Sequence, residues 1–93
     1  MIKFKVLDIS EDQRPNDYWK EYLERHADFS YNRQSKEMTF NVRTDSSGLL
    51  RIIDWMLAFD IIDKKVVIDL ENRFRRSFDG DELTYNPSRN RFY

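Results

Sequence analysis

Residues 46–61 constrain the fold most, because their apolar side chains have the spacing of a deeply buried helix. At about 100° per residue these side chains fall within roughly half of the helix circumference. They are Leu49, Ile52, Ile53, Met56, Leu57 and Phe59. Arg51 and Asp54 form a narrow polar stripe opposite, and Trp55 lies on its flank. An ordinary surface helix has an apolar arc of about 100° or somewhat more, so this helix is expected to be covered on more than one side.

Two interpretations of the wide apolar arc remain open. The helix is either sunk between a sheet and a second helix, or it docks another chain through the flank that carries Leu50 and Trp55. Asp60 would point to the apolar side of a longer helix, so the helix is expected to end near Phe59. Three consecutive residues can supply the N-cap: Asp45, Ser46 and Ser47.

Alternating apolar and polar side chains predict strands elsewhere. Residues 2–9 alternate as in a half-buried strand. Residues 29–33 and 38–43 alternate in the same way around a polar turn and are expected to form a hairpin. Residues 64–70 are rich in β-branched side chains, which favours a fourth strand.

A second helix is predicted between the first two strands, opened by Pro15 or Asn16 and running to about residue 27. Its apolar stripe has the spacing i, i+3, i+4 and i+7. The stripe consists of Trp19, Tyr22, Leu23 and His26.

The predicted order is β-α-β-β-α-β, the ferredoxin-like arrangement. We therefore expect the α+β class, with a single antiparallel sheet, two helices on one face and a short C-terminal extension. One domain is expected over residues 1–86, with a short edge strand at 83–85 and a tail at 87–93. Residues 71–78 stay ambiguous. The inward face is expected to hold Phe4, Val6, Phe29, Tyr31, Phe40, Val42, Val66 and Ile68. The outward face is expected to hold Lys3, Lys5, Ser30, Asn32, Thr39, Asn41 and Arg43.

Composition argues against several classes of function. The 16 Lys and Arg residues are balanced by 17 Asp and Glu residues, so bulk attraction to nucleic acid or an anionic membrane is not expected. The chain has no cysteine, which excludes disulfides, zinc–thiolate sites and cysteine nucleophiles. This fits a reducing cytoplasm. No apolar run approaches the roughly 18 residues that a membrane span needs.

Catalytic, metal and cofactor signals are weak. The only histidine, His26, lies on an apolar stripe, where packing or capping is the usual role. Asp79, Asp81 and Glu82 surround Gly80 in what is predicted to be a solvated turn, without the pattern of a calcium loop. We expect no metal and no cofactor, and an enzyme using only carboxylates and hydroxyls is a remote third hypothesis.

RNA recognition by base stacking needs aromatic side chains on the open face of the sheet. The corresponding positions are Lys3, Lys5, Thr39 and Asn41. Phe4 and Phe40 have the opposite parity, so stacking on this face is not expected.

The lead hypothesis is a small non-enzymatic module that binds a protein partner, as a regulator, an inhibitor or a subunit. The expected partner-binding residues are Trp55, Arg73, Phe74, Arg75, Arg76, Arg89, Arg91 and Tyr93, because Arg and aromatic side chains are typical of interfaces. A homodimer through the exposed edge of the fourth strand or the last segment is also plausible. The alternative is nucleic-acid binding through Lys3, Lys5, Arg43 and the arginines at 73, 75 and 76.

Overall fold

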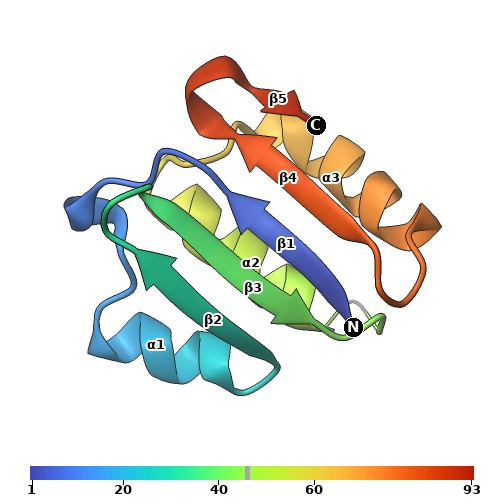
Figure 1. The fold of residues 1–93 in the computed structure, drawn as a ribbon, viewed down its shortest axis with the longest axis horizontal. Coiled ribbons are helices and arrows are strands. Elements are labelled where there is room, and N and C mark those ends of the chain that lie inside the picture. Colours follow the sequence, from blue (N-terminus) through green and yellow to red (C-terminus); the bar gives the residue numbers. More distant parts are fainter. Residues whose placement is uncertain (46) are drawn as a thin grey trace.

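A mixed β-sheet with helices on one face makes up the computed structural model, which describes residues 1–45 and 47–93 (Figure 1). The strands and α-helices in these residues are β1 (Ile2–Val6), α1 (Asp17–Glu24), β2 (Ala27–Asn32), β3 (Glu37–Val42), α2 (Ser47–Ala58), α3 (Lys64–Arg76), β4 (Glu82–Asn86) and β5 (Arg91–Phe92). Short 3-10 turns, η1 (Glu11–Gln13) and η2 (Pro87–Arg89), join some of them. The strand order across the sheet is β2-β3-β1-β4-β5.

The α+β class is confirmed, but the purely antiparallel sheet is wrong and the ferredoxin-like order is not confirmed. β1 pairs antiparallel with β3 and parallel with β4. The cause is α3, because two consecutive helices lie between β3 and β4. One helix would bring the chain into β4 antiparallel to β1. The second helix adds one more reversal, so β4 runs parallel to β1.

The fourth strand expected at residues 64–70 is wrong, since these residues form the first half of α3. The Asp63 side chain caps the helix by accepting a hydrogen bond from the Lys65 N–H at 2.9 Å. Leu70 and Phe74, one helical turn apart, are buried against the core. Ile68, expected to face inward, is 69% exposed. Helical spacing and the cap therefore outweigh the β-branched run. Because residues 64–70 do not form a strand, the homodimer expected through the edge of that strand is excluded.

The C-terminal part of the chain is more integrated than expected. Residues 71–76 continue α3, so the ambiguous stretch 71–78 is helical as far as Arg76. The strand expected at 83–85 is β4, and it lies between β1 and β5 rather than at the edge of the sheet. Residues 87–93, expected to be a tail, contain η2 and β5, and β5 pairs with β4.

The helix at the centre of the structure is α2, which lies between α1 and α3 on the sheet (Figure 1). Its apolar residues Leu49, Ile52, Trp55 and Met56 are at most 2% exposed. This supports the interpretation of a helix sunk between a sheet and its neighbours. At its start, Asp45 accepts a hydrogen bond from the Ser47 hydroxyl. The third N-cap candidate, Ser46, lies outside the described residues.

The two faces of the sheet differ in chemistry, as the alternation in β1, β2 and β3 predicts. Phe4, Val6, Phe40 and Val42 are fully buried under the helices. The rings of Phe4 and Phe40 are stacked, with their centroids 6.3 Å apart. Lys3, Ser30 and Asn32 are exposed on the opposite face. The expected orientation of these three strands is confirmed.

Gly48 in the first turn of α2 allows the helix to approach its neighbours closely. A Cβ at this position would lie 2.8 Å from the backbone oxygen of His26 and 3.1 Å from Val42 Cγ1. Alanine normally stabilises a helix by about 1 kcal/mol relative to glycine. Here the close contact with backbone has the opposite effect, because the neighbours cannot move away freely.

We expect Gly48→Ala to lower the free energy of unfolding by about 1–3 kcal/mol, the usual cost of overpacking. Urea denaturation followed by circular dichroism measures it. Ile68→Ala is the control, since this side chain is exposed on α3 and its loss should cost no more than about 0.5 kcal/mol. A Gly48→Ala protein as stable as wild type would show that α2 is not seated as closely as described.

Candidate functional site

Two of the eight residues expected to bind a partner are buried. Trp55 is fully buried, and its Nε1–H donates a hydrogen bond to the Gln13 carbonyl at 3.0 Å. Phe74 is 3% exposed. Trp55 lies beside the narrow polar stripe of α2, but η1 and the Phe40 ring of β3 contact it there. Neither residue offers surface to a partner, and we remove both from the candidate site.

Of the remaining residues, three arginines lie on α3, whereas Arg89, Arg91 and Tyr93 lie in or after η2 and β5. The guanidinium of Arg73 lies 4.6 Å from the ring of Phe92 in β5, and its Nε–H donates to Asp69. Arg75 is two positions further, about 200° around the helix, and it lines a groove against α2. The exposed residues are Arg73, Arg75, Arg76, Arg89, Arg91 and Tyr93. The structure therefore does not unite the predicted set in one surface.

The residues expected for nucleic-acid binding also lie apart. Lys3 and Lys5 are on the open face of the sheet, and Lys5 Nζ pairs with Glu82 at 3.3 Å. Arg43 follows β3 and lines a small hollow that also includes Asp28. The α3 arginines belong to the layer of helices on the other face. Glu82 pairs with Lys5 and lies opposite Lys3, so these two lysines share the open face with a carboxylate.

Aromatic side chains of α1 and Phe59 form a group in which Tyr18 is exposed, and the sequence analysis did not predict it as a binding surface. Trp19 packs edge-to-face against Tyr18, Tyr22 and Phe59, with ring centroids 5.4, 5.5 and 6.0 Å apart. The Tyr18 side chain is 69% exposed, whereas Trp19 and Phe59 also touch the core. We call these four residues the aromatic surface.

Contacts to α2 hold the aromatic surface in place. The Asn16 side chain caps α1 by accepting from the Trp19 N–H at 3.0 Å. The Tyr22 hydroxyl donates to Asp54 Oδ2 at 2.6 Å. Arg51 donates to the Tyr22 carbonyl at 2.9 Å, and its guanidinium lies 4.5 Å from the Tyr22 ring. An eight-residue helix is marginal by itself, so these contacts give α1 its fixed position.

A shallow hollow of about 250 Å³ adjoins the aromatic surface. Its lining consists of Tyr18, Glu21, Tyr22 and Arg25. The spacing i, i+3, i+4 and i+7 places these side chains on one exposed face of α1. This spacing is visible in the sequence and could have identified the exposed face of α1. Tyr18 is only about 40° from Tyr22 around a helix, and it lies outside the buried stripe.

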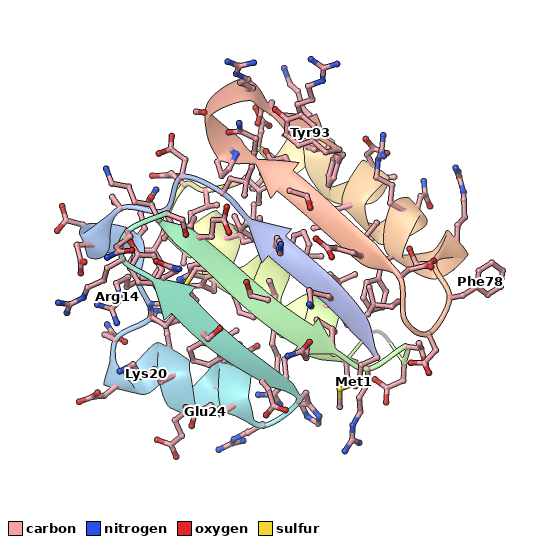
Figure 2. All side chains as sticks on the ribbon, in the orientation of Figure 1. Met1, Arg14, Lys20, Glu24, Phe78 and Tyr93 are labelled. Atoms are coloured by element: carbon pink, nitrogen blue, oxygen red, sulfur yellow. The ribbon has the colours of Figure 1, made fainter. Side chains whose placement is uncertain are left out.

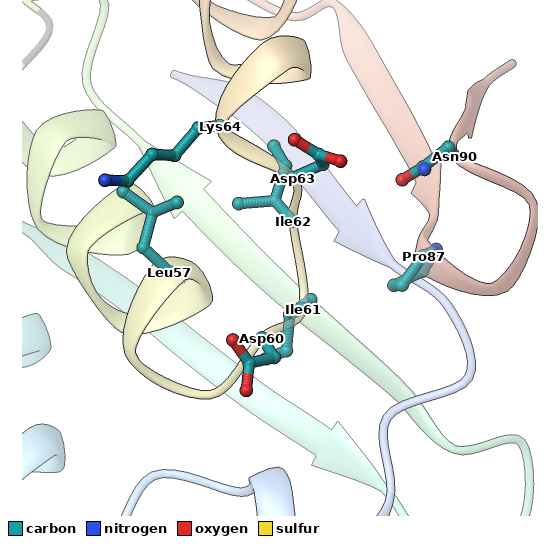
Figure 3. Close-up of a pocket in the computed structure, with 8 residues that line it drawn as sticks. All are labelled: Leu57, Asp60, Ile61, Ile62, Asp63, Lys64, Pro87 and Asn90. Carbon is teal, nitrogen blue, oxygen red and sulfur yellow. The ribbon is translucent and has the colours of Figure 1, made fainter.

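A cavity of about 450 Å³ lies at the junction of α2, α3 and η2 (Figure 3). Asp60 and Asp63 lie on the segment that joins the two helices, and Asn90 faces them from the loop after η2. Two of these polar groups already have structural roles. Asp63 caps α3, and Asn90 Oδ1 accepts a hydrogen bond from the Tyr85 hydroxyl at 2.6 Å. Burial raises the pKa of Tyr85, and the charge of Asp63 adds to the effect.

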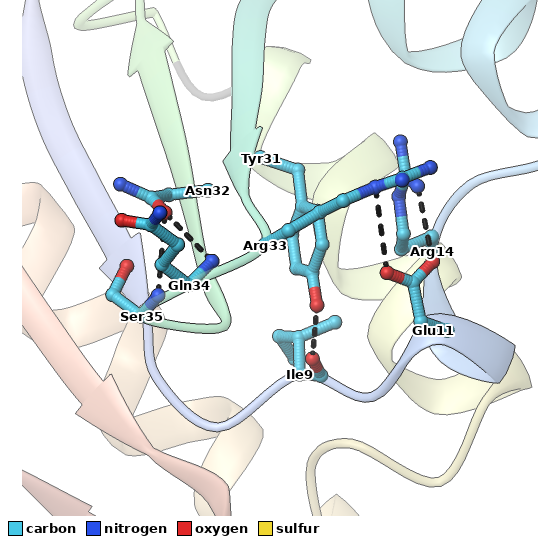
Figure 4. Close-up of polar contacts among 8 residues, drawn as sticks. All are labelled: Ile9, Glu11, Arg14, Tyr31, Asn32, Arg33, Gln34 and Ser35. Atoms are coloured by element: carbon cyan, nitrogen blue, oxygen red, sulfur yellow. Dashed lines mark hydrogen bonds and ion pairs between the residues drawn. The ribbon is translucent and has the colours of Figure 1, made fainter.

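A polar cluster ties η1 to the β2–β3 hairpin (Figure 4). Glu11 pairs with Arg14 at 3.1 Å and with Arg33 at 3.6 Å. The Tyr31 hydroxyl donates to the Ile9 carbonyl at 2.7 Å, and the Arg14 guanidinium covers the Tyr31 ring. These contacts fix the chain that leads from β1 into α1. They therefore help to fix where α1 begins.

Neither a cluster of metal ligands nor a membrane-spanning helix occurs in the described residues. In residues 1–45 and 47–93, no group of three or more His, Cys, Asp or Glu side chains is arranged to hold a metal ion. No helix in the described part of the chain has the length and apolar character to cross a bilayer. Comparison with protein-family models, curated proteins and solved structures finds no match.

The hydrogen bond to Asp54 raises the pKa of Tyr22, with smaller contributions from burial and from the charge of Asp54. A raised pKa means that the folded state holds the phenol proton more tightly than the unfolded state does. The resulting stability is present below the ordinary tyrosine pKa of 10.0 and is lost as the pH rises through the folded-state value.

We expect Tyr22→Phe to lower the free energy of unfolding by about 0.5 kcal/mol at neutral pH, the low end for one hydrogen bond because the pair is exposed. Urea denaturation at neutral and alkaline pH checks this, and the deficit should shrink in alkali. Tyr93→Phe is the control, with no deficit expected. An equal deficit for Tyr22→Phe at both pH values would contradict the assigned hydrogen bond.

Proposed function

We propose that the protein is a small non-enzymatic module that binds another protein through the aromatic surface of α1. The observation that carries the proposal is the packing of exposed Tyr18 on Trp19, which itself packs on Tyr22, with Arg25 lining the same hollow. Trp, Tyr and Arg are the residue types that most often dominate binding energy at protein interfaces. The partner is a protein that the module regulates, inhibits or joins as a subunit, in the cytoplasm.

Rigidity supports this choice of surface. Binding costs free energy whenever mobile side chains become ordered. Tyrosine and tryptophan have few rotatable bonds, and here the Tyr22 ring is held by Asp54 and Arg51 before any partner arrives. The aromatic surface therefore requires less ordering than the long arginines of α3 and β5.

The charged side chains around the aromatic surface are suited to selecting the partner. Asp17, Lys20, Glu21, Glu24 and Arg25 are exposed on α1. Charges at the rim of an interface influence association rate and specificity more than affinity. A partner with complementary charges around an apolar centre fits this pattern.

We expect Tyr18→Ala to weaken partner binding at least about tenfold, since a central aromatic is typically worth more than about 1.4 kcal/mol. The experiment is capture of the partner from a lysate of the encoding organism with immobilised protein, followed by titration with the purified partner. Tyr93→Ala is the matched control, because Tyr93 is exposed to a similar degree, 60% against 69%, on a distant part of the fold.

Both variants should keep the circular dichroism spectrum of the wild type, because neither side chain is part of the core. The proposal predicts that Tyr93→Ala retains the partner. Equal binding by wild type and Tyr18→Ala would rule out the aromatic surface as the contact.

A further inference from the structure

A groove of about 400 Å³ lies between the first half of α2 and the second half of α3. We call it the α2–α3 groove, and its lining consists of Thr44, Asp45, Leu49, Leu50, Glu71, Phe74 and Arg75. Leu49 and Phe74 are buried at its base, while Leu50 is 53% exposed. The groove therefore combines apolar side chains with two carboxylates and one guanidinium.

Phe78 is a protruding aromatic side chain close to the same end of α3. It is 78% exposed, more than any other large hydrophobic side chain in the described residues. Figure 2 shows it pointing away from the body of the molecule. The backbone below it is ordered by hydrogen bonds, since the Phe78 N–H donates to Asp81 Oδ2 at 2.7 Å and the Phe78 carbonyl accepts from the Asp81 N–H at 2.9 Å.

The groove is large enough for a phenyl ring. An apolar cavity of about 150 Å³ can bind benzene, and the α2–α3 groove exceeds that volume. The two hydrogen bonds fix the backbone of the turn that carries Phe78, and its ring points away from the body of its own molecule (Figure 2). A ring from another molecule is free to enter the groove.

The charges of the two features are complementary. Arg76, two residues before Phe78, is exposed and is not part of the groove lining. The groove contributes the carboxylates of Asp45 and Glu71. Asp45 is held in the charged form, because the hydrogen bonds that it accepts from Ser47 lower its pKa. Arg75 in the same lining offsets one of the two carboxylates, so the groove keeps one net negative charge to meet Arg76 beside the Phe78 ring.

We propose that two copies of this chain form a two-fold dimer in which Phe78 of each copy occupies the α2–α3 groove of the other. A two-fold interface must be self-complementary, with each patch contacting its counterpart reciprocally. One molecule that carries both the protruding ring and the matching groove satisfies that condition. The groove lies on the α3 side of α2, away from α1, so the dimer leaves the aromatic surface free for a different partner.

The dimer is expected to be weak. A buried aromatic side chain removes about 150–250 Å² from water, so the two phenylalanines account for about 300–500 Å². Stable interfaces bury about 1,200–2,000 Å² in total. Association should therefore depend on concentration, with monomer and dimer in rapid exchange.

Sedimentation velocity and light scattering over about 5–500 µM protein, a range that covers weak affinities, test the dimer. The wild-type average mass should rise with concentration from 11.4 kDa toward twice that value. Phe78→Ser should remain monomeric throughout. Ile68→Ser is the matched control, because Ile68 is equally apolar and 69% exposed on α3 but does not line the groove; it should associate like wild type.

A charge exchange tests the orientation independently of the ring. Arg76→Glu should weaken association, and Arg76→Glu combined with Glu71→Arg should restore it. All of these positions are at the surface, and circular dichroism verifies that each variant is folded. A wild-type protein that stays monomeric at the highest concentration overturns the proposal. So does association that Phe78→Ser leaves unchanged or that Ile68→Ser abolishes equally.

Discussion

The packing of α2 against the sheet is the interaction on which the rest of the structure depends. Trp55 contacts Phe40 with ring centroids 5.6 Å apart, and Phe40 in turn stacks on Phe4. The indole N–H is satisfied by the Gln13 carbonyl, so this large side chain is buried without an unpaired polar group. Because the other helices pack on either side of α2, its position sets theirs. The aromatic surface and the α2–α3 groove both follow from this arrangement.

The elements that alternation or amphipathic spacing marks clearly are the ones that could be predicted from the sequence. The first three strands, α1 and α2 all match, and the inward parity of Phe4 and Phe40 is correct. α3 could not be predicted from local preference, because Val66, Val67 and Ile68 favour a strand. Its helical form depends on the Asp63 cap and on the burial of Leu70 and Phe74 against α2 and the sheet. Tertiary contacts therefore decided this segment, and the direction of β4 changed with it.

Less of the candidate site could be predicted, because exposure depends on which neighbours cover each face of a helix. Trp55 was predicted to be accessible from its place beside a polar stripe, yet η1 and Phe40 contact it and it is fully buried. The arginines near the end of α3 are close in sequence but turn to opposite sides of the helix. Tyr18 was not predicted as a binding residue because it lies outside the apolar stripe of α1. Its exposure makes it a candidate for binding. Amphipathic spacing identifies the side chains that a helix buries. It does not show which of the remaining side chains can bind a partner.

The parallel pairing of β1 with β4 has a consequence for how the chain folds. Lys3 lies opposite Glu82, so the centre of the sheet joins segments from nearly opposite ends of the sequence. Such long-range pairing raises the contact order and slows folding. During synthesis, β1 can pair with β3 long before β4 emerges from the ribosome, and its other edge stays open until then. Pairing with β4 therefore closes an edge of β1 through which the chain could otherwise aggregate.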